Sequence, residues 1–108
     1  MGYTTAANVE PWTGRMRHRI ARAVRWCRAV AAAIEDGEYR GEPVEVPTRI
    51  KVRRGVWMKS PPKALRVTAG ELLRGDCKAT EPALLHVSQY YEALEPHLPD
   101  SLKFDTDD

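Results

Sequence analysis

The chain has 108 residues and a formal net charge of +2, with 43% hydrophobic and 30% charged residues. A chain of this length forms one small domain around a modest core, and the composition is too apolar for a generally disordered protein. The longest apolar run, residues 29–34, is far too short to span a membrane, and residues 1–9 lack the features of a signal peptide. We therefore expect a cytoplasmic protein that does not bind membranes.

The charges are segregated along the chain. Residues 15–34 contain six arginines and no acidic residue, and residues 49–78 contain nine Lys or Arg residues against two acidic ones. The other two blocks are acidic: residues 35–48 have five acidic residues against one arginine, and residues 79–108 have seven against one lysine. Such blocks produce an oriented electric field even when the net charge is small, so the pattern indicates a charged partner.

A basic amphipathic helix is predicted from Pro11 to Asp36, followed by Gly37, a residue typical of the position after a last helical turn. Trp26 lies at the border of its two faces, where it either stacks on a base or borders the core, and the second is favoured. The apolar face consists of Met16, Ile20, Ala23, Val24, Cys27, Val30, Ala31 and Ile34. The opposite face carries Arg15, His18, Arg19, Arg22, Arg25 and Arg28.

The middle of the chain contains the strongest β-strand pattern. Residues 49–53 alternate basic and apolar side chains and residues 56–58 run back, which predicts a β-hairpin. Its turn is either the two residues Arg54-Gly55 or a three-residue loop with Gly55 in a left-handed conformation. The preceding connector, residues 38–47, contains two prolines, and apolar Val44 and Val46 flank Glu45 in a strand-like alternation. It is therefore interpreted as a short edge strand.

Three further elements are predicted after the hairpin. Residues 63–67 form a third short strand or an extended lead-in, and Thr68 with Glu71 has capping-box spacing for a short helix from Ala69 to Arg74. Thr80 is then predicted to cap a final helix that ends before Pro96. The buried stripe of that helix consists of Leu84, Val87, Tyr91 and Leu94.

These elements predict an α+β fold with a long N-terminal helix, a β-hairpin or small antiparallel sheet, and then a short and a medium C-terminal helix. The domain is expected to cover residues 10–99. Residues 1–9 are expected to form a flexible N-terminus, and residues 100–108 an acidic flexible tail in which only Leu102 or Phe104 docks on the core.

No set of residues in the sequence resembles an active site. His18 and Cys27 point about 180° apart on the predicted helix, so they cannot form a nucleophile pair. The two cysteines lie too far apart in the sequence to suggest a zinc site, and no glycine-rich phosphate loop is present. We expect no enzymatic activity, no catalytic residues, no metal and no cofactor.

The basic helix and the hairpin are the candidate binding surfaces. Guanidinium groups at helical spacing can contact successive phosphates, and a two-stranded ribbon with a basic face fits a DNA groove. We therefore expect a small nucleic-acid-binding accessory or regulatory protein, with DNA favoured over RNA. The predicted binding residues are Arg15, Arg19, Arg22, Arg25, Arg28, Arg49, Lys51, Arg53, Arg54 and Trp57.

The same charges also fit a non-enzymatic protein-interaction module, such as an adaptor, an inhibitor or an assembly subunit of the kind that phages and mobile elements encode. In that case the basic helix contacts an acidic protein surface, or the acidic last helix of a second copy in a homodimer. The least specific interpretation is that both basic faces are merely solvated. Insertion into a membrane surface is disfavoured, because the apolar face of the helix is rich in alanine.

Overall fold

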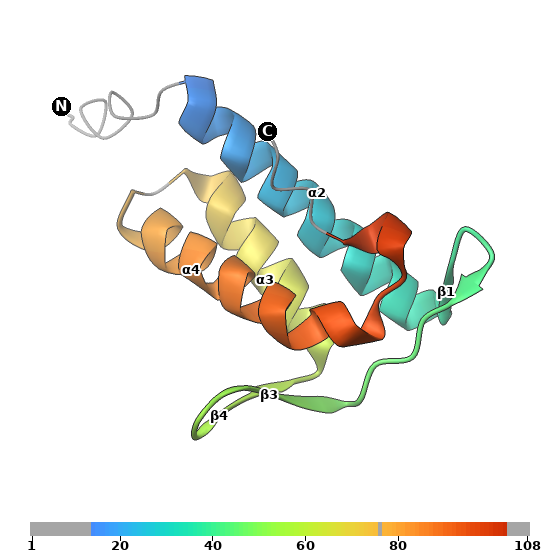
Figure 1. Ribbon diagram of the computed structural model, residues 1–108. Helices are drawn as coiled ribbons and strands as arrows, with labels where there is room; N and C mark the ends of the chain where they lie inside the picture. Colours follow the sequence, from blue (N-terminus) through green and yellow to red (C-terminus); the bar gives the residue numbers. More distant parts are fainter. Residues whose placement is uncertain (1–13, 76, 104–108) are drawn as a thin grey trace, which may run out of the picture.

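The computed structural model describes residues 14–75 and 77–103, and it confirms the predicted α+β arrangement (Figure 1). Three α-helices, two small antiparallel hairpins and two short 3₁₀ helices follow one another in the described part of the chain. In order, they are α2 (Gly14–Asp36), β1 (Glu38–Tyr39), β2 (Glu42–Pro43), β3 (Arg49–Arg53), β4 (Val56–Lys59), α3 (Pro61–Arg74), α4 (Cys77–Leu94), η1 (Glu95–His97) and η2 (Asp100–Leu102).

Helix α2 forms where the 3.6-residue period predicted it, although the start at Pro11 lies outside the described residues. It ends at Asp36, and the following Gly37 has a φ of +80° and donates its backbone N–H to the Ala33 carbonyl at 2.8 Å. The helix buries a broader face than the periodicity indicated. The buried residues are Ala23, Val24, Trp26, Cys27, Val30, Ala31 and Ala33, whereas Met16, Ile20 and Ile34 are half-buried.

The connector after α2 begins with a small β-hairpin that has a two-residue turn. The edge strand predicted around Glu45 is therefore wrong. Arg40 and Gly41 both have positive φ, which is the geometry of a tight turn between antiparallel strands. The strands therefore pair at residues 38–39 and 42–43, before the alternating segment begins. Val44 follows them and is buried in the core.

The second hairpin, β3–β4, is confirmed. Ile50 pairs with Met58 on the inner face and both are buried, whereas Lys51 pairs with Trp57 on the outer face and both are exposed. The turn contains Gly55 with a φ of +76°, a conformation that an L-residue adopts only at an energetic cost. An irregularity in the register between Lys51 and Arg53 adjoins this turn.

The prediction of a strand or extended lead-in at residues 63–67 is wrong, because helix α3 already begins at Pro61. The predicted cap at Thr68 is wrong for the same reason, since Thr68 is a buried residue in the interior of α3. Proline lacks an N–H and has a fixed φ, so it suits the first helical turn, where the N–H would have no helical partner. The two prolines after Ser60 therefore both end β4 and begin α3. Gly75, with a φ of +70°, follows the last residue of α3 and donates its N–H to the Leu72 carbonyl.

Helix α4 begins at Cys77, three residues before the predicted cap. Thr80 is consequently an interior helical residue, completely buried, and the prediction that it caps the helix is wrong. Pro82 lies inside the helix rather than in its first turn. An interior proline removes one backbone hydrogen bond of the helix, yet α4 continues through Pro82 to Leu94.

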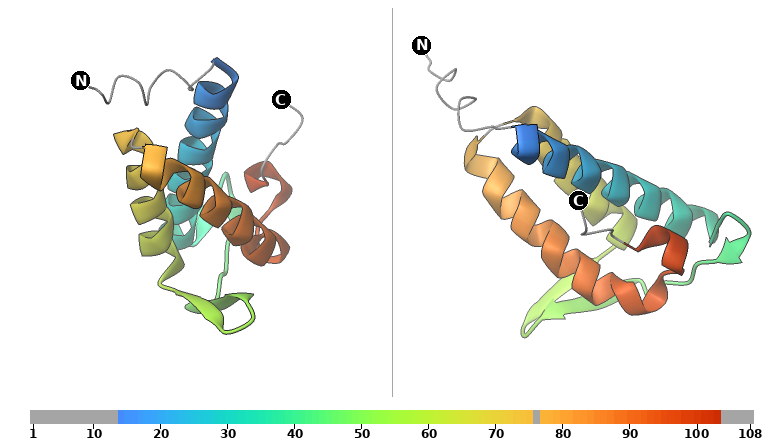
Figure 2. Two further views of the ribbon diagram at one scale, coloured as in Figure 1. Left: turned by 90° about the vertical axis from the view of Figure 1, so that its left-hand side faces the viewer. Right: turned by 45° about the horizontal axis from the view of Figure 1, so that its top comes forward.

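The three helices pack side by side, with α2 and α3 antiparallel and α3 turning directly into α4 (Figures 1 and 2). After α4 the chain turns back through η1 and η2 onto α2, where Leu102 is buried as predicted. Residues 100–102, expected to begin a flexible tail, thus form part of the fold. The core contains residues from all three helices and from the segment between α2 and α3. Among them are Cys27, Val30, Ile50, Leu65, Leu72, Ala83 and Leu94.

Candidate nucleic-acid interface

The outer face of the β3–β4 hairpin concentrates basic side chains around one tryptophan. Strand alternation places Arg49, Lys51, Trp57 and Lys59 on this face, because Arg49 pairs with Lys59 and Lys51 pairs with Trp57. All four are exposed, and 47% of the Trp57 side chain is accessible to solvent. The guanidinium carbon of Arg49 lies over the Trp57 ring, 4.7 Å from its centre, in a cation–π contact.

Two further predicted residues, Arg53 and Arg54, lie exposed at the tip of the hairpin. No acidic residue occurs in residues 46–70. Within residues 14–75 and 77–103, none of the hairpin cations forms an ion pair with an acidic side chain. The hairpin therefore presents a positive surface that the described acidic residues do not neutralise by direct contact. We define this surface, comprising Arg49, Lys51, Arg53, Arg54, Trp57 and Lys59, as the basic hairpin face.

Lys59 is the member of this face that the sequence-based list of binding residues omits. Its position two residues after Trp57 places it on the same side of β4, so the alternation that selected Trp57 also points to Lys59. It adds a fourth cation to the three basic residues of β3.

The arginines of α2 are only partly available. Arg15, Arg19, Arg25 and Arg28 are exposed, as predicted, whereas Arg22 is half-buried and its Nη2 atom is shielded from solvent. The returning C-terminal segment lies on this side of the helix. Arg22 lies there in a depression that Trp26, Leu102 and Lys103 also line.

The interpretation of Trp26 as a base-stacking residue is wrong, because only 7% of this side chain is exposed. Its indole Nε1–H donates to the Leu102 carbonyl at 2.8 Å. Its ring meets the Tyr91 ring edge-on, with the ring centres 5.8 Å apart. Trp26 thus holds the C-terminal segment against α2 and belongs to the core, which was the favoured expectation.

The two predicted basic surfaces do not merge. The hairpin packs against α4 and α3, and the views in Figures 1 and 2 show these helices between the hairpin and the N-terminal half of α2. A ligand on the basic hairpin face therefore does not also rest on the exposed arginines of α2 unless it bends around the helices.

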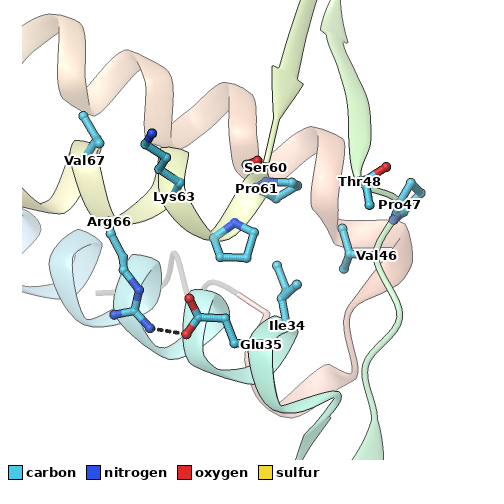
Figure 3. A pocket seen from close by; sticks show the side chains of 11 residues that line it. Ile34, Glu35, Val46, Pro47, Thr48, Ser60, Pro61, Lys63, Arg66 and Val67 are labelled. Carbon is cyan, nitrogen blue, oxygen red and sulfur yellow. Dashed lines mark hydrogen bonds and ion pairs between the residues drawn. The ribbon is translucent and has the colours of Figure 1, made fainter.

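A groove of about 650 Å³ separates the end of α2 from the start of α3 and the segment before β3 (Figure 3). Arg66 extends across it and donates to the Glu35 carboxylate at 2.6 Å, and Glu35 raises the pKa of Arg66. The remaining lining is largely proline and aliphatic side chains, with Lys63 at the edge. Because its one carboxylate already pairs with Arg66, this groove offers no set of acid, base and nucleophile.

Cys27 is completely buried among apolar residues of α2, and burial raises the pKa of its thiol to about 12 from an ordinary value of 9.0. A thiol without thiolate character is a poor nucleophile, which agrees with the interpretation of Cys27 as a small hydrophobic residue.

We expect the Cys27 thiol to resist alkylation by iodoacetamide at pH 8 in the native protein and to react once urea unfolds the chain. The folded state also retains the thiol proton at a pH where the unfolded state has lost it. The contribution of the buried, protonated Cys27 thiol to the free energy of unfolding is therefore complete below pH 9. It is lost between pH 9 and about 12, at up to about 1.4 kcal/mol per pH unit. A Cys77→Ser background isolates Cys27, and equal labelling of native and unfolded protein would contradict the prediction.

Comparison of the chain with protein-family models, curated proteins and solved structures finds no match. Within the described residues, no cluster of three His, Cys, Asp or Glu side chains is arranged to hold a metal ion. None of the described helices has the length and apolar character needed to cross a membrane.

Proposed function

We propose that the protein is a small cytoplasmic nucleic-acid-binding accessory or regulatory protein, with DNA favoured over RNA, and that the basic hairpin face is its principal contact surface. The observation that supports this most directly is the group of exposed cations around Trp57, which form no ion pair with the acidic side chains that the structure describes. The exposed arginines of α2 supply a second, separate surface for phosphates.

Binding by such a surface is driven largely by release of the counterions that condense on nucleic acid. Each lysine or arginine that contacts a phosphate displaces counterions, so the logarithm of the binding constant falls linearly with the logarithm of the salt concentration. For duplex DNA the slope is about −0.9 per phosphate contacted. Because hairpin and helix lie on different sides of the fold, a stiff duplex contacts one of them at a time.

The test compares the wild type with three double variants that each remove two positive charges from exposed positions. Lys51→Gln with Arg54→Gln alters the basic hairpin face, Arg19→Gln with Arg25→Gln alters α2, and Lys63→Gln with Arg74→Gln on α3 is the matched control. Affinity for a random-sequence DNA duplex is measured by fluorescence anisotropy over a range of salt concentrations.

The hairpin pair is expected to weaken binding roughly 10- to 100-fold at 0.1 M salt and to reduce the salt slope by about 1.8, whereas the control pair changes neither substantially. A larger loss of affinity in the α2 double variant would show that α2, rather than the hairpin, is the principal contact surface. Absence of salt-dependent binding in the wild type, together with a dimeric mass, would overturn the proposal and support a protein-interaction module.

A further inference from the structure

We infer that the basic hairpin face binds single-stranded nucleic acid, with Trp57 as the platform on which a base stacks. This inference rests on the proposed function and specifies its ligand. It begins from the contrast between the two tryptophans that the structure describes. Trp26 is buried with its N–H bonded to the protein, whereas Trp57 exposes about half of its side chain on the outer face of a sheet.

The surroundings of Trp57 suit a nucleotide. Lys51 lies directly across the hairpin from it, Lys59 follows on the same face, and the Arg49 guanidinium rests on its ring. The cation–π contact restrains the indole, which lowers the entropy lost when a base stacks on its exposed part. The neighbouring cations lie within one or two strand positions of the ring, where they reach the phosphates that flank a stacked base.

A single strand fits this face better than a duplex does. In a duplex both faces of each base are already stacked, whereas the bases of a single strand are free to stack on an aromatic side chain. The segment from Val46 to Gly70 also contains no Asn, Gln, Asp or Glu, the residues that with arginine read base edges in a duplex groove. We therefore infer binding that tolerates many sequences and depends on stacking and charge.

The face is short, which limits what it contacts. From Arg49 to Arg53 strand β3 extends about 13 Å. The inner face of the hairpin packs on the helices, so only the outer face is accessible. A short oligonucleotide is consequently sufficient to occupy the site.

The experiment uses the full chain with fluorescein-labelled oligothymidylate, oligouridylate and a mixed-sequence duplex of the same length. Wild type is compared with Trp57→Ala and Trp57→Phe, after circular dichroism has shown each variant to be folded. The wild type is expected to bind the single strands more tightly than the duplex. The alanine variant is expected to lose about 5- to 100-fold in affinity for the single strands while its salt slope stays unchanged, because no charge is altered.

Trp57→Phe keeps an aromatic face and is expected to retain most of the affinity, so this variant separates stacking from a general disturbance of the hairpin. Quenching of tryptophan fluorescence by oligothymidylate is expected in the wild type and reduced in Trp57→Phe. Comparison of oligothymidylate with oligouridylate distinguishes DNA from RNA as the preferred source of the strand.

Tighter binding of the duplex, or an unchanged affinity of Trp57→Ala for single strands, would overturn this inference and leave the proposed nucleic-acid function intact. Absence of binding to all three probes at low salt would overturn both.

Discussion

Replacing Trp26 with alanine is expected to lower the free energy of unfolding by about 3–5 kcal/mol, a large fraction of the stability of a small domain. The substitution empties a site that is 93% shielded from solvent, removes the edge-on contact with Tyr91 and deprives the Leu102 carbonyl of its donor. The free energy is measured by urea denaturation followed by circular dichroism, and proteolytic cleavage near residues 95–103 is expected to accelerate.

Two further variants interpret this loss of stability: Trp26→Phe separates packing from the hydrogen bond, and Trp57→Ala is the control at an exposed tryptophan. Phenylalanine retains most of the packing but cannot donate a hydrogen bond to Leu102, so it is expected to cost about 1–3 kcal/mol. Trp57→Ala removes a tryptophan from an exposed position and is expected to change stability by less than about 1 kcal/mol. A loss below 1 kcal/mol for Trp26→Ala would contradict a structural role for this residue.

The second large effect is expected at Leu65, which is completely buried on α3, the helix that packs most extensively against α2. Leu65→Ala removes apolar contact and leaves a cavity that rigid helices fill only in part, so we expect a loss of about 2–5 kcal/mol. The midpoint of thermal unfolding is expected to fall accordingly, by roughly 4–8 °C for each kcal/mol.

Val67 on the same helix provides the matched control, because 54% of its side chain is exposed. Val67→Ala is expected to change stability by about 0.5 kcal/mol or less, since alanine is also the better helix former. Similar losses for the two variants would show that α3 does not pack against α2 as described.

Sequence patterns correctly predicted those elements whose geometry depends only on residues close to one another in the sequence. The period of residues 16–34 placed Cys27, Val30 and Ala31 in the core, and the alternation of residues 49–53 placed Arg49 and Lys51 outside it. These predictions succeeded because a helix face or a strand face follows directly from residue spacing. The same reasoning located most of the basic hairpin face.

The failures near the helix starts have a different cause. Pro61 and Pro62 directly follow the hairpin, where proline is equally suited to ending a strand and to occupying the first turn of a helix. Thr80 has a side chain suited to capping, and that preference concealed its position inside α4. Both signals are ambiguous in sequence, and packing of the helix decides between the alternatives.

Long-range packing was beyond prediction from local patterns. Nothing in residues 14–36 indicates that residues 95–102 return to a second side of α2, yet Leu102 accepts the Trp26 N–H there and lines a depression together with Arg22. The separation of the basic hairpin face from the α2 arginines likewise depends on where α3 and α4 pack. Each basic element was predictable on its own, whereas their relative placement was not.

The bond between Trp26 and Leu102 joins residues 76 positions apart, which has a consequence for synthesis of the chain on the ribosome. At about 5–20 residues per second, the partner of Trp26 is made about 4–15 s after Trp26 itself. During that interval the Trp26 indole N–H lacks the carbonyl that it binds in the folded domain. Folding of this domain is therefore completed only after translation has passed residue 102.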